Sequence, residues 1–299
     1  MASSSATLSI AEDGGVSVIT GSPDIGGSRA SMALIAAEVL GVDFDTISPQ
    51  VAATDAVGYC DTTGGSRTTL ATGEAVIRAA TMLVDDLKSR AAALWETEVS
   101  RVEWLDGCAR EVVDSTTGTD GPRTLTLKQL AAKAGATGGS LTASASLNAT
   151  SSQPSFAVNL CDAEVDPDTG KVTIRRFTCI QDAGKAIHPA YVEGQMQGGA
   201  VQGIGWALNE EYLYNEDGSM DNAGFLDYRI PVASDLPMID TVIVEVANPL
   251  HPFGVRGVGE VPIVPPMPAV ASAVYQAAGV RVCDLPLTPP KLLLAMDNA

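Results

Sequence analysis

One carboxylate of this 299-residue chain stands in a sequence setting that suits proton transfer. Glu260 follows the flexible run Gly-Val-Gly at 257–259 and precedes an apolar, proline-rich stretch. Apolar neighbours would desolvate the carboxylate and raise its pKa, which suits a general base that works near neutral pH. The alternative is an ordinary glutamate paired with the nearby Arg256, and the local residues leave both interpretations open.

A second segment combines glutamines with closely spaced glycines, in the run GQMQGGAVQG at residues 194–203. A glutamine amide both donates and accepts hydrogen bonds, so it suits the edge of a heterocycle such as a pterin. Glycines would allow a bulky group to lie directly on the backbone. A glycine-rich packing helix with surface glutamines is the alternative.

Two glycine-rich loops, at residues 21–28 and 59–67, each precede a predicted helix. Such loops present backbone N–H groups at the positive end of a helix dipole, which is an anion site. Neither loop matches the dinucleotide fingerprint or the P-loop, and tight turns without a ligand remain the alternative. The candidate residues are Gly26, Gly27 and Ser28 in the first loop and Gly64, Gly65, Ser66 and Arg67 in the second.

The remaining polar candidates favour structural roles. His188 and His251 each stand beside a proline, and neither shows metal-ligand spacing. Asp24 and Asp61 are typical of side chains that stabilise their own loops.

Hydrophobic patterns predict an α/β (α+β) chain with mixed sheets and packed helices. Ser28 is expected to cap the first helix and Gly41 to end it. Small, polar residues at 136–154 predict a boundary between two lobes, 1–150 and 151–299. The expected helices are at about 29–40, 70–94, 189–214 and 264–279, and the expected strands are at 8–10, 16–19, 47–52, 155–164, 171–180 and 240–247, with short strands in 99–115 and a surface loop at 116–124.

Composition limits the partners and the compartment. The net charge of −18 argues against binding nucleic acid or anionic membranes. No apolar run approaches the roughly 20 residues that span a bilayer. The N-terminal residues do not resemble a secretory signal, so we expect a cytoplasmic protein. The five cysteines are scattered without a C-x-x-C pair, which favours thiols that behave as small buried hydrophobes.

Taken in order, these segments resemble the C-terminal portion of the molybdenum-binding subunit of the xanthine dehydrogenase, aldehyde oxidase and carbon monoxide dehydrogenase family. The resemblance extends from about Val16 to Leu294. Its most specific parts are residues 63–73, 193–208, 227–231, 235–237 and 257–262.

The resemblance implies a two-lobed molybdopterin-binding domain. Its cofactor would be molybdenum on a pterin dithiolene, in bacteria usually with a cytosine dinucleotide tail, so no protein side chain would bind the metal directly. The implied reaction hydroxylates a carbon of a small N-heterocycle or aldehyde, with water as the oxygen source. Electrons would leave through 2Fe-2S clusters and, as an optional further carrier, FAD, both on partner subunits.

The resemblance also assigns roles to individual residues by position. Glu260 matches the family's base, and Gln195 matches a glutamine that contacts the pterin. The remaining matches to the cofactor site are Gly26, Gly27 and Ser28 in the first loop, Gly64, Gly65, Ser66 and Arg67 in the second, and Gly259 beside the base.

Two departures from the family pattern stand out. The first loop reads DIGGS at 24–28, where the family often has Glu-x-Gly-Gln-Gly, so a glutamine amide is missing. Nothing in the chain resembles the family's N-terminal half, which carries much of the substrate pocket. We therefore expect a split subunit whose other half is a separate chain, with a fragment of an intact subunit as the alternative.

Two other functions compete with the hydroxylase. A non-catalytic assembly module that kept the fold would carry no molybdenum. A hydrolase that uses His251 and Glu260 lacks a plausible nucleophile motif.

Overall fold

The structure is a computed structural model that describes residues 3–112 and 122–299. The chain forms two compact units, Met1–Ser152 with Pro249–Val255 and Gln153–Asn248 with Arg256–Ala299. Most of the predicted surface loop at 116–124 lies outside the described residues.

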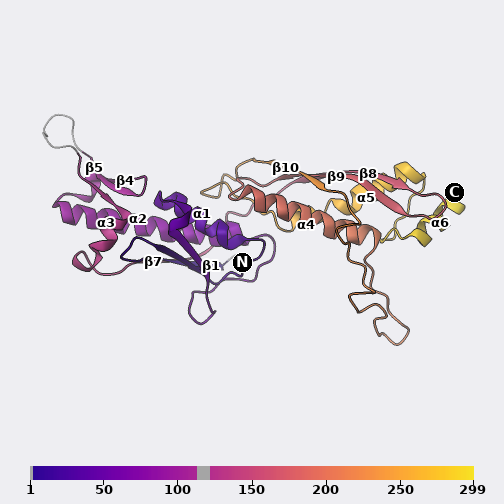
Figure 1. Cartoon of the computed structure of the whole chain (residues 1–299), viewed down its shortest axis with the longest axis horizontal. Coiled ribbons are helices and arrows are strands. Elements are labelled where there is room, and N and C mark those ends of the chain that lie inside the picture. Colours follow the sequence, from indigo (N-terminus) through magenta and orange to yellow (C-terminus); the bar gives the residue numbers. More distant parts are fainter. Residues whose placement is uncertain (1–2, 113–121) are drawn as a thin grey trace. The chain divides into compact units, whose positions relative to one another are not determined.

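The first unit is built on a four-stranded sheet with the order β3-β2-β1-β7 (Figure 1). The hairpin β1–β2 is antiparallel, β3 adds in parallel to β2, and β7 adds antiparallel to β1. Two helices, α1 and α2, pack against this sheet and against each other. The elements are β1 (Ser3–Ile10), β2 (Val16–Thr20), α1 (Ser28–Leu40), β3 (Ile47–Val51), α2 (Gly73–Trp95) and β7 (Leu141–Asn148).

A small three-stranded sheet and a short helix complete this unit. The sheet has the order β4-β5-β6, and the indole nitrogen of Trp104 on β4 donates to the Leu40 carbonyl at 2.9 Å. Thr126 and Gln129 form a capping box at the start of α3. The elements are β4 (Val102–Leu105), β5 (Cys108–Glu111), β6 (Thr124–Thr126) and α3 (Leu127–Ala132), with 3-10 turns at Phe44–Thr46, Val99–Arg101 and Ala134–Ala136.

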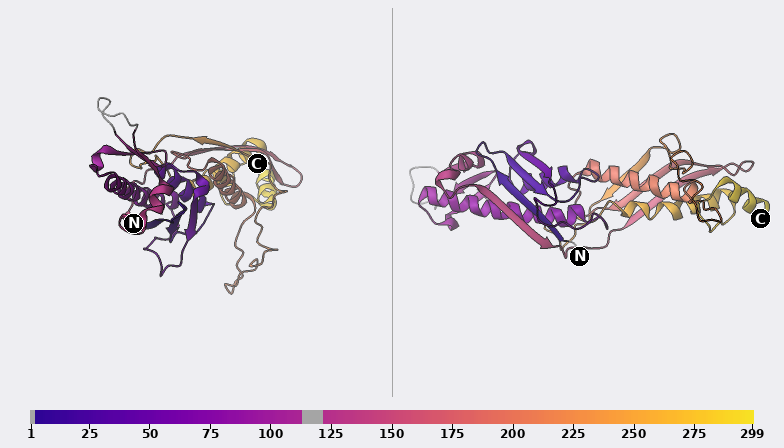
Figure 2. Two further views of the ribbon diagram at one scale, coloured as in Figure 1. Left: turned by 60° about the vertical axis from the view of Figure 1, so that its left-hand side comes forward. Right: turned by 90° about the horizontal axis from the view of Figure 1, so that it is seen from below.

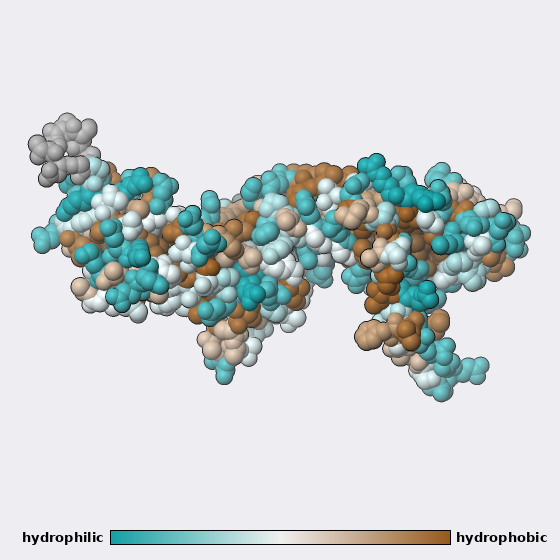
Figure 3. Space-filling model, in the orientation of Figure 1, coloured by the Kyte–Doolittle hydropathy of each residue, from teal (hydrophilic) through white to brown (hydrophobic). Residues whose placement is uncertain are grey.

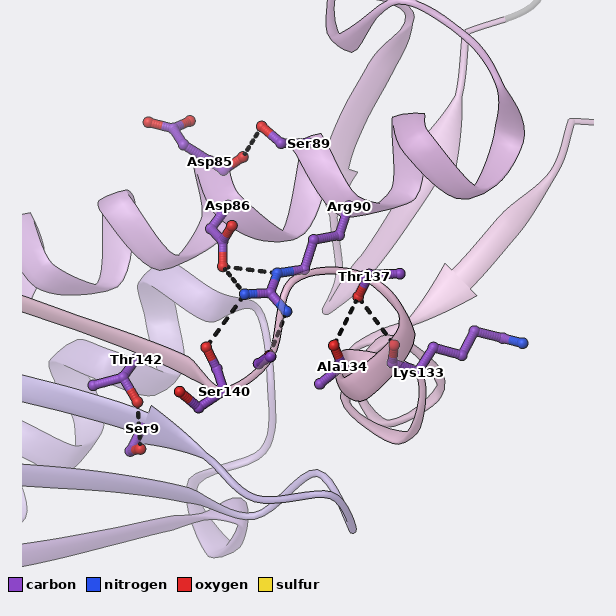
Figure 4. Close-up of polar contacts among 11 residues, drawn as sticks. Ser9, Asp85, Asp86, Ser89, Arg90, Lys133, Ala134, Thr137, Ser140 and Thr142 are labelled. Carbon is purple, nitrogen blue, oxygen red and sulfur yellow. Dashed lines mark hydrogen bonds and ion pairs between the residues drawn. The ribbon is translucent and has the colours of Figure 1, made fainter.

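The region expected to separate the lobes, 136–154, contains the strand β7, and the two units divide at Ser152 and Gln153, within this region. Its small residues alternate, and their hydroxyls pair with those of β1, as in Thr7–Ser144 at 2.8 Å. Arg90 of α2 fixes the chain just before β7, because its guanidinium donates to the Gly139 and Ser140 carbonyls and pairs with Asp86 (Figure 4). The first unit therefore includes this stretch up to Ser152.

The second unit is a three-stranded sheet, order β10-β9-β8, with helices on one face (Figures 1 and 2). The hairpin β8–β9 is antiparallel, and β10 runs parallel to β9. Phe177 of β9, Met196 and Ile204 of α4 and Val270 of α5 meet in one core. The elements are β8 (Ala157–Val165), β9 (Val172–Asp182), α4 (Pro189–Leu208), β10 (Ile239–Val244), α5 (Pro266–Ala278) and α6 (Pro289–Asp297), with a 3-10 turn at Val261–Ile263.

The helix predicted to reach Tyr214 ends at Leu208. An excursion from Asn209 to Met238 follows, with one isolated bridge between Tyr214 and Met220. It extends away from the C-terminal end of α4 (Figure 1).

Candidate functional site

Glu260 lies at the entry to the 3-10 turn Val261–Ile263. Two side chains of the second unit hold the backbone just before it. Gln181 on β9 donates from Nε2 to the Val258 carbonyl at 3.4 Å. Arg256 donates to the Val246 carbonyl at 3.0 Å and forms an ion pair with Asp182 at 3.1 Å.

The expected burial of Glu260 is wrong for this chain, because the residue is exposed. The proline-rich stretch faces α4 and not the carboxylate. A Cβ added at Gly199 would lie 2.7 Å from the Pro262 Cβ, and one at Gly203 would lie 2.7 Å from the Pro266 Cβ. Any desolvation of Glu260 must therefore come from groups outside this stretch.

Four of the five glycines of α4 divide into two sets, and the helix is unbroken over its 20 residues. Gly199 and Gly203 allow the close approach of the proline-rich stretch. A Cβ added at Gly194 or Gly198 would meet nothing within 4 Å. One side of the helix is therefore bare backbone with room for a group to lie on it.

Gln195 lies beside this bare side, because residues three and four apart share a helix face. It is half-buried, and within the described residues its side-chain amide has no hydrogen-bond partner. The side-chain amide of Gln197, by contrast, donates from Nε2 to the Ile239 carbonyl at 3.2 Å. Of Gln195 and Gln197, Gln195 is thus the one whose amide remains available, and it lies beside the open glycines.

In the first unit, the first glycine loop turns into α1 through two left-handed residues, Gly26 and Gly27, with φ of 63° and 77°. The N-cap is Gly27, so the predicted cap at Ser28 is wrong. The Ser28 hydroxyl donates instead to the Pro23 carbonyl at 3.3 Å. Asp24 takes the loop-stabilising role expected of it, since its carboxylate accepts the Arg29 N–H at 3.0 Å.

The second glycine loop is strained. Gly65 and Ser66 both have positive φ, at 67° and 58°, and the value at Ser66 is uncommon for a residue with a side chain. Positions for a Cβ at Gly64 and Gly65 are open. A π-helical turn, Thr68–Thr72, follows before α2 begins at Gly73, so the helix predicted from Leu70 begins with a widened turn. Such strain and π turns occur frequently at functional sites.

Arg67 is buried, and its guanidinium is engaged by the protein itself. Its Nη1 donates to the Asp61 carbonyl at 2.8 Å, and its Nη2 donates to the Ser3 carbonyl and to the Ser4 hydroxyl, both at 2.5 Å. The side chain therefore ties the second loop to β1. These contacts give Arg67 a supporting role in the second loop, and its assignment to the cofactor site stays a prediction.

Both histidines have structural contacts. His188 accepts the Tyr191 N–H at the start of α4 and stacks on the Tyr191 ring. His251 is buried, and its Nδ1 accepts the N–H groups of Phe253 and Val255. Burial lowers the pKa of His251. Sequence reasoning did not anticipate its contact with Leu70, which places residues 249–255 in the first unit.

Asp182, Gln181 and Arg256 are supporting residues that the sequence interpretation missed. The available signal was the polar pair Gln181-Asp182 at the end of a hydrophobic strand, where an apolar residue would be expected on the inner face. Only the folded chain shows that both side chains reach the segment before Glu260.

The glycine loops of the first unit and Gln195 of the second each offer donors that suit a polar heterocycle such as a pterin. Backbone N–H groups beside open glycines and an available amide can bind a polar heterocycle. In residues 3–112 and 122–299, no group of three or more His, Cys, Asp and Glu side chains could hold a metal ion. Within the same described ranges, no helix is both long and apolar enough to cross a membrane.

Comparison with known proteins gives consistent matches. A family model described as a molybdopterin cofactor-binding domain matches residues 1–237. The chain is 33% identical over 297 residues to the putative xanthine dehydrogenase molybdenum-binding subunit of Escherichia coli (strain K12), over 96% of this chain and 38% of that protein. It is 33% identical over 296 residues to the 6-hydroxypseudooxynicotine dehydrogenase complex subunit gamma of Paenarthrobacter nicotinovorans, over 95% of this chain and 36% of that protein.

Comparison with solved structures finds enzymes of related function. Quinoline 2-oxidoreductase from Pseudomonas putida 86 matches with a TM-score of 0.85 and 27% identity, over 99% of this chain and 38% of that chain. The predicted fold class, mixed sheets with packed helices, is confirmed. The chain spans little more than a third of the length of these relatives.

Proposed function

This chain belongs to the molybdopterin cofactor-binding family, with the molybdenum subunits of xanthine dehydrogenase-type oxidoreductases, and we propose that it is the C-terminal portion of a molybdenum hydroxylase subunit. The whole enzyme would hydroxylate a carbon of a small N-heterocycle or an aldehyde with oxygen from water. When bound, the molybdenum–pterin group supplies the two-electron oxidation that such a hydroxylation requires.

In the first unit, two loops would bind the cofactor through their backbone. Gly26, Gly27 and Ser28 lead into α1, whose N-terminal N–H groups attract the phosphates of a dinucleotide tail. The second loop offers open backbone at Gly64 and Gly65, followed by the strained Ser66. Arg67 holds this loop in place through its contacts with β1.

In the second unit, Gln195 would bind a pterin edge through its amide, and the bare backbone at Gly194 and Gly198 makes room for the ring beside it. Gly259 belongs to the turn that brings the chain to Glu260. No side chain of this chain is assigned to the metal itself.

Glu260 would act as the general base, taking a proton on one of its carboxylate oxygens from the attacking water. The observation that carries this assignment is the fixed turn before it. Gln181 holds the Val258 carbonyl, and the Arg256–Asp182 ion pair holds the chain two residues earlier. A base must be held in one geometry to be effective, and this turn provides such support.

The substrate class is inferred from the relatives. Xanthine, named in one relative, and quinoline, named in another, are both N-heterocycles. The pocket would be shaped largely by the portion of the subunit that this chain does not cover. The electron-poor carbon beside a ring nitrogen is the reacting atom that we expect.

The complete assembly would be hetero-oligomeric and cytoplasmic. It would include the other half of the molybdenum subunit, an iron–sulfur subunit with 2Fe-2S clusters and, as an optional component, an FAD subunit. The name of the Paenarthrobacter relative, a dehydrogenase complex subunit, agrees with such an organisation. The cofactor would carry a cytosine dinucleotide.

The test is the Glu260→Gln variant of the purified complex, with Glu98→Gln as a control at an exposed glutamate of the first unit. Turnover of N-heterocycles and aldehydes should fall by at least about a hundredfold in the first variant, since general-base catalysis contributes about that much or more. Molybdenum and pterin content should be unchanged in both. Near-normal turnover in Glu260→Gln overturns the base assignment. A wild-type complex without molybdenum and pterin favours a non-catalytic assembly module.

A further inference from the structure

The sheet of the second unit has a bare apolar face, and we propose that it is the docking surface for the portion of the molybdenum subunit that this chain does not cover. The outer face, as it is named here, comprises Phe156, Val158, Leu160, Ile180, Val242 and Val244. This inference rests on the proposed function, because it concerns the polypeptide that would complete the same catalytic unit.

The strands alternate between two faces, and both faces are apolar. Residues on the inner face, such as Phe177 and Cys179, pack in the core with α4 and α5. On the outer face, Phe156, Val158 and Leu160 are 68%, 57% and 58% exposed. An antiparallel strand with one solvated face normally carries polar residues there, so this pattern is that of a sheet with a second covering layer.

One row of apolar residues crosses all three strands. Val158 pairs with Ile180, and Ile180 pairs with Val242, so the three side chains form one row. Val244, which is 38% exposed, extends the patch along β10, beside Asp182, its register partner on β9, which is held in the ion pair with Arg256. Figure 3 shows hydrophobic residues gathered over β9 and β10. Contiguous apolar patches of this kind mark protein interfaces.

The patch ends at a charged border on the same face. The row of Leu160 continues through Thr178 to Asp240, and the next row holds Asp162 and Arg176. Arg176 forms an exposed ion pair with Asp240 at 3.0 Å. The apolar area is therefore centred on the row of Val158, Ile180 and Val242, with Leu160, Phe156 and Val244 beside it. A hydrophobic centre with a polar rim is the usual anatomy of a stable interface.

The strand ends that carry Phe156 and Val244 also hold the approach to Glu260. Arg256 donates to the carbonyls of Pro154 and Val246, which continue β8 and β10 past the patch. A polypeptide seated on the outer face would thus lie next to the segment that leads to the exposed Glu260. Covering both would supply the desolvation that this chain does not give the carboxylate.

The length of the relatives identifies the occupant. The chain covers 38% of the xanthine dehydrogenase subunit and 38% of the quinoline oxidoreductase chain, so most of each relative lies outside the matched portion. A permanent contact of that portion suits an apolar surface, whereas transient electron-transfer contacts are small and more polar. A second copy of this chain would cover the face without adding the missing length.

The experiment places a photo-crosslinking amino acid at Leu160 in the purified complex, and at Leu294 as a control on α6 that is 65% exposed. Mass spectrometry identifies the peptides joined to each position. Cross-links from position 160 to the N-terminal portion of the molybdenum subunit, with few from position 294, support the proposal. Cross-links to a second copy, to an iron–sulfur or flavin subunit, or to nothing overturn it.

A second measurement uses Leu160→Lys and Leu294→Lys in the same complex. The first should reduce recovery of the N-terminal portion by about tenfold or more, while the second should leave it unchanged. Circular dichroism of each variant checks that the sheet is intact, and equal recovery in both variants overturns the proposal. Measuring molybdenum and pterin in the wild-type complex distinguishes a failure of the proposed function from a failure of the docking surface. Their absence would sink the proposed function, whereas a cofactor-loaded complex without the cross-link would sink only the docking surface.

Discussion

The Nε2 atom of His251 lies 3.1 Å from the carbonyl oxygen of Leu70, in the π-helical turn that follows the second glycine loop. The other ring nitrogen accepts two backbone N–H groups, from Phe253 and Val255. Nε2 must therefore carry the proton, and the ring is neutral. This contact joins a late segment of the chain to the first unit.

The neutral ring makes the stability of the first unit depend on pH. Burial lowers the pKa of His251 below its ordinary value, against the opposing effects of the Leu70 carbonyl and the Glu74 charge. As pH falls below about 6.5, the unfolded chain takes up a proton that the folded chain does not, so stability is lost. Urea unfolding of the wild type should therefore weaken more steeply between pH 7.5 and 5.5 than that of His251→Gln. Parallel pH profiles for the two proteins would contradict this assignment.

The glycines of α4 provide a matched pair of substitutions. Gly203→Ala places a methyl group 2.7 Å from the Pro266 Cβ and 2.8 Å from the Ile263 carbonyl oxygen, so we expect destabilisation by about 1–3 kcal/mol. Gly198→Ala has open space and should stabilise the chain by about 0.5–1 kcal/mol through helix propensity. Thermal unfolding of both variants checks the signs. A stabilised Gly203→Ala would show that the proline-rich stretch does not pack on this helix.

Gly198→Ala also separates folding from cofactor binding. If the bare side of α4 receives the pterin, the added methyl group should lower the pterin content of the complex even though the chain is more stable. Pterin content equal to wild type would remove Gly198 from the proposed binding surface.

Hydrophobic periodicity along the sequence predicted the helices and strands that neighbouring residues determine. Sequence patterns predict a helix over 189–214 despite its glycines, and the structure shows that Gly199 and Gly203 allow close packing of this helix. The strand β7 escaped prediction because its pairing with β1 joins residues more than 130 positions apart. Its serines and threonines are typical of a linker until the hydroxyls of β1 are placed opposite them.

Some features of the candidate site could likewise be predicted from the sequence, and others depend on the tertiary fold. The glycine loops and Gln195 could be chosen from residue type and order, since backbone freedom and amide chemistry are properties of the residues themselves. The exposure of Glu260 could not, because it depends on which way the proline-rich stretch faces after packing. The network of Asp182, Gln181 and Arg256 joins segments about 75 residues apart and likewise depends on the tertiary fold.

The thiols should differ sharply in reactivity. Burial raises the pKa of Cys161 and of Cys179 to about 11. Burial also raises the pKa of Cys60, but hydrogen bonds, chiefly from Ser5, outweigh it and the net shift is downward. Cys283 is exposed, contrary to the expectation that the cysteines are buried hydrophobes.

At pH 8, Cys161 and Cys179 should therefore react with iodoacetamide about a hundredfold more slowly than an ordinary thiol, because only the thiolate is the nucleophile. Cys60 and Cys283 should be modified first. Peptide mass spectrometry of the folded chain over a time course measures each rate, and unfolding in urea should equalise them. Equal rates in the folded chain would contradict the burial of the two core thiols.

The ion pair between Asp182 and Arg256 should stabilise the second unit more than a surface pair does. Asp182 also accepts the Gly184 and Val246 N–H groups, and the side chains of Asp182 and Arg256 are only 11% and 10% exposed. Asp182→Asn keeps the shape but leaves Arg256 without its charge partner, so we expect a loss of about 2–4 kcal/mol in urea unfolding. The double variant Asp182→Asn with Arg256→Gln should regain part of the lost unfolding free energy, because it no longer contains a buried arginine without a charge partner. Glu164→Gln, which breaks the exposed pair with Arg175, should have little effect.

If the effects of Asp182→Asn and Arg256→Gln on the free energy of unfolding simply add, the two side chains do not couple. The turn before Glu260 would then be held by Gln181 and the backbone alone.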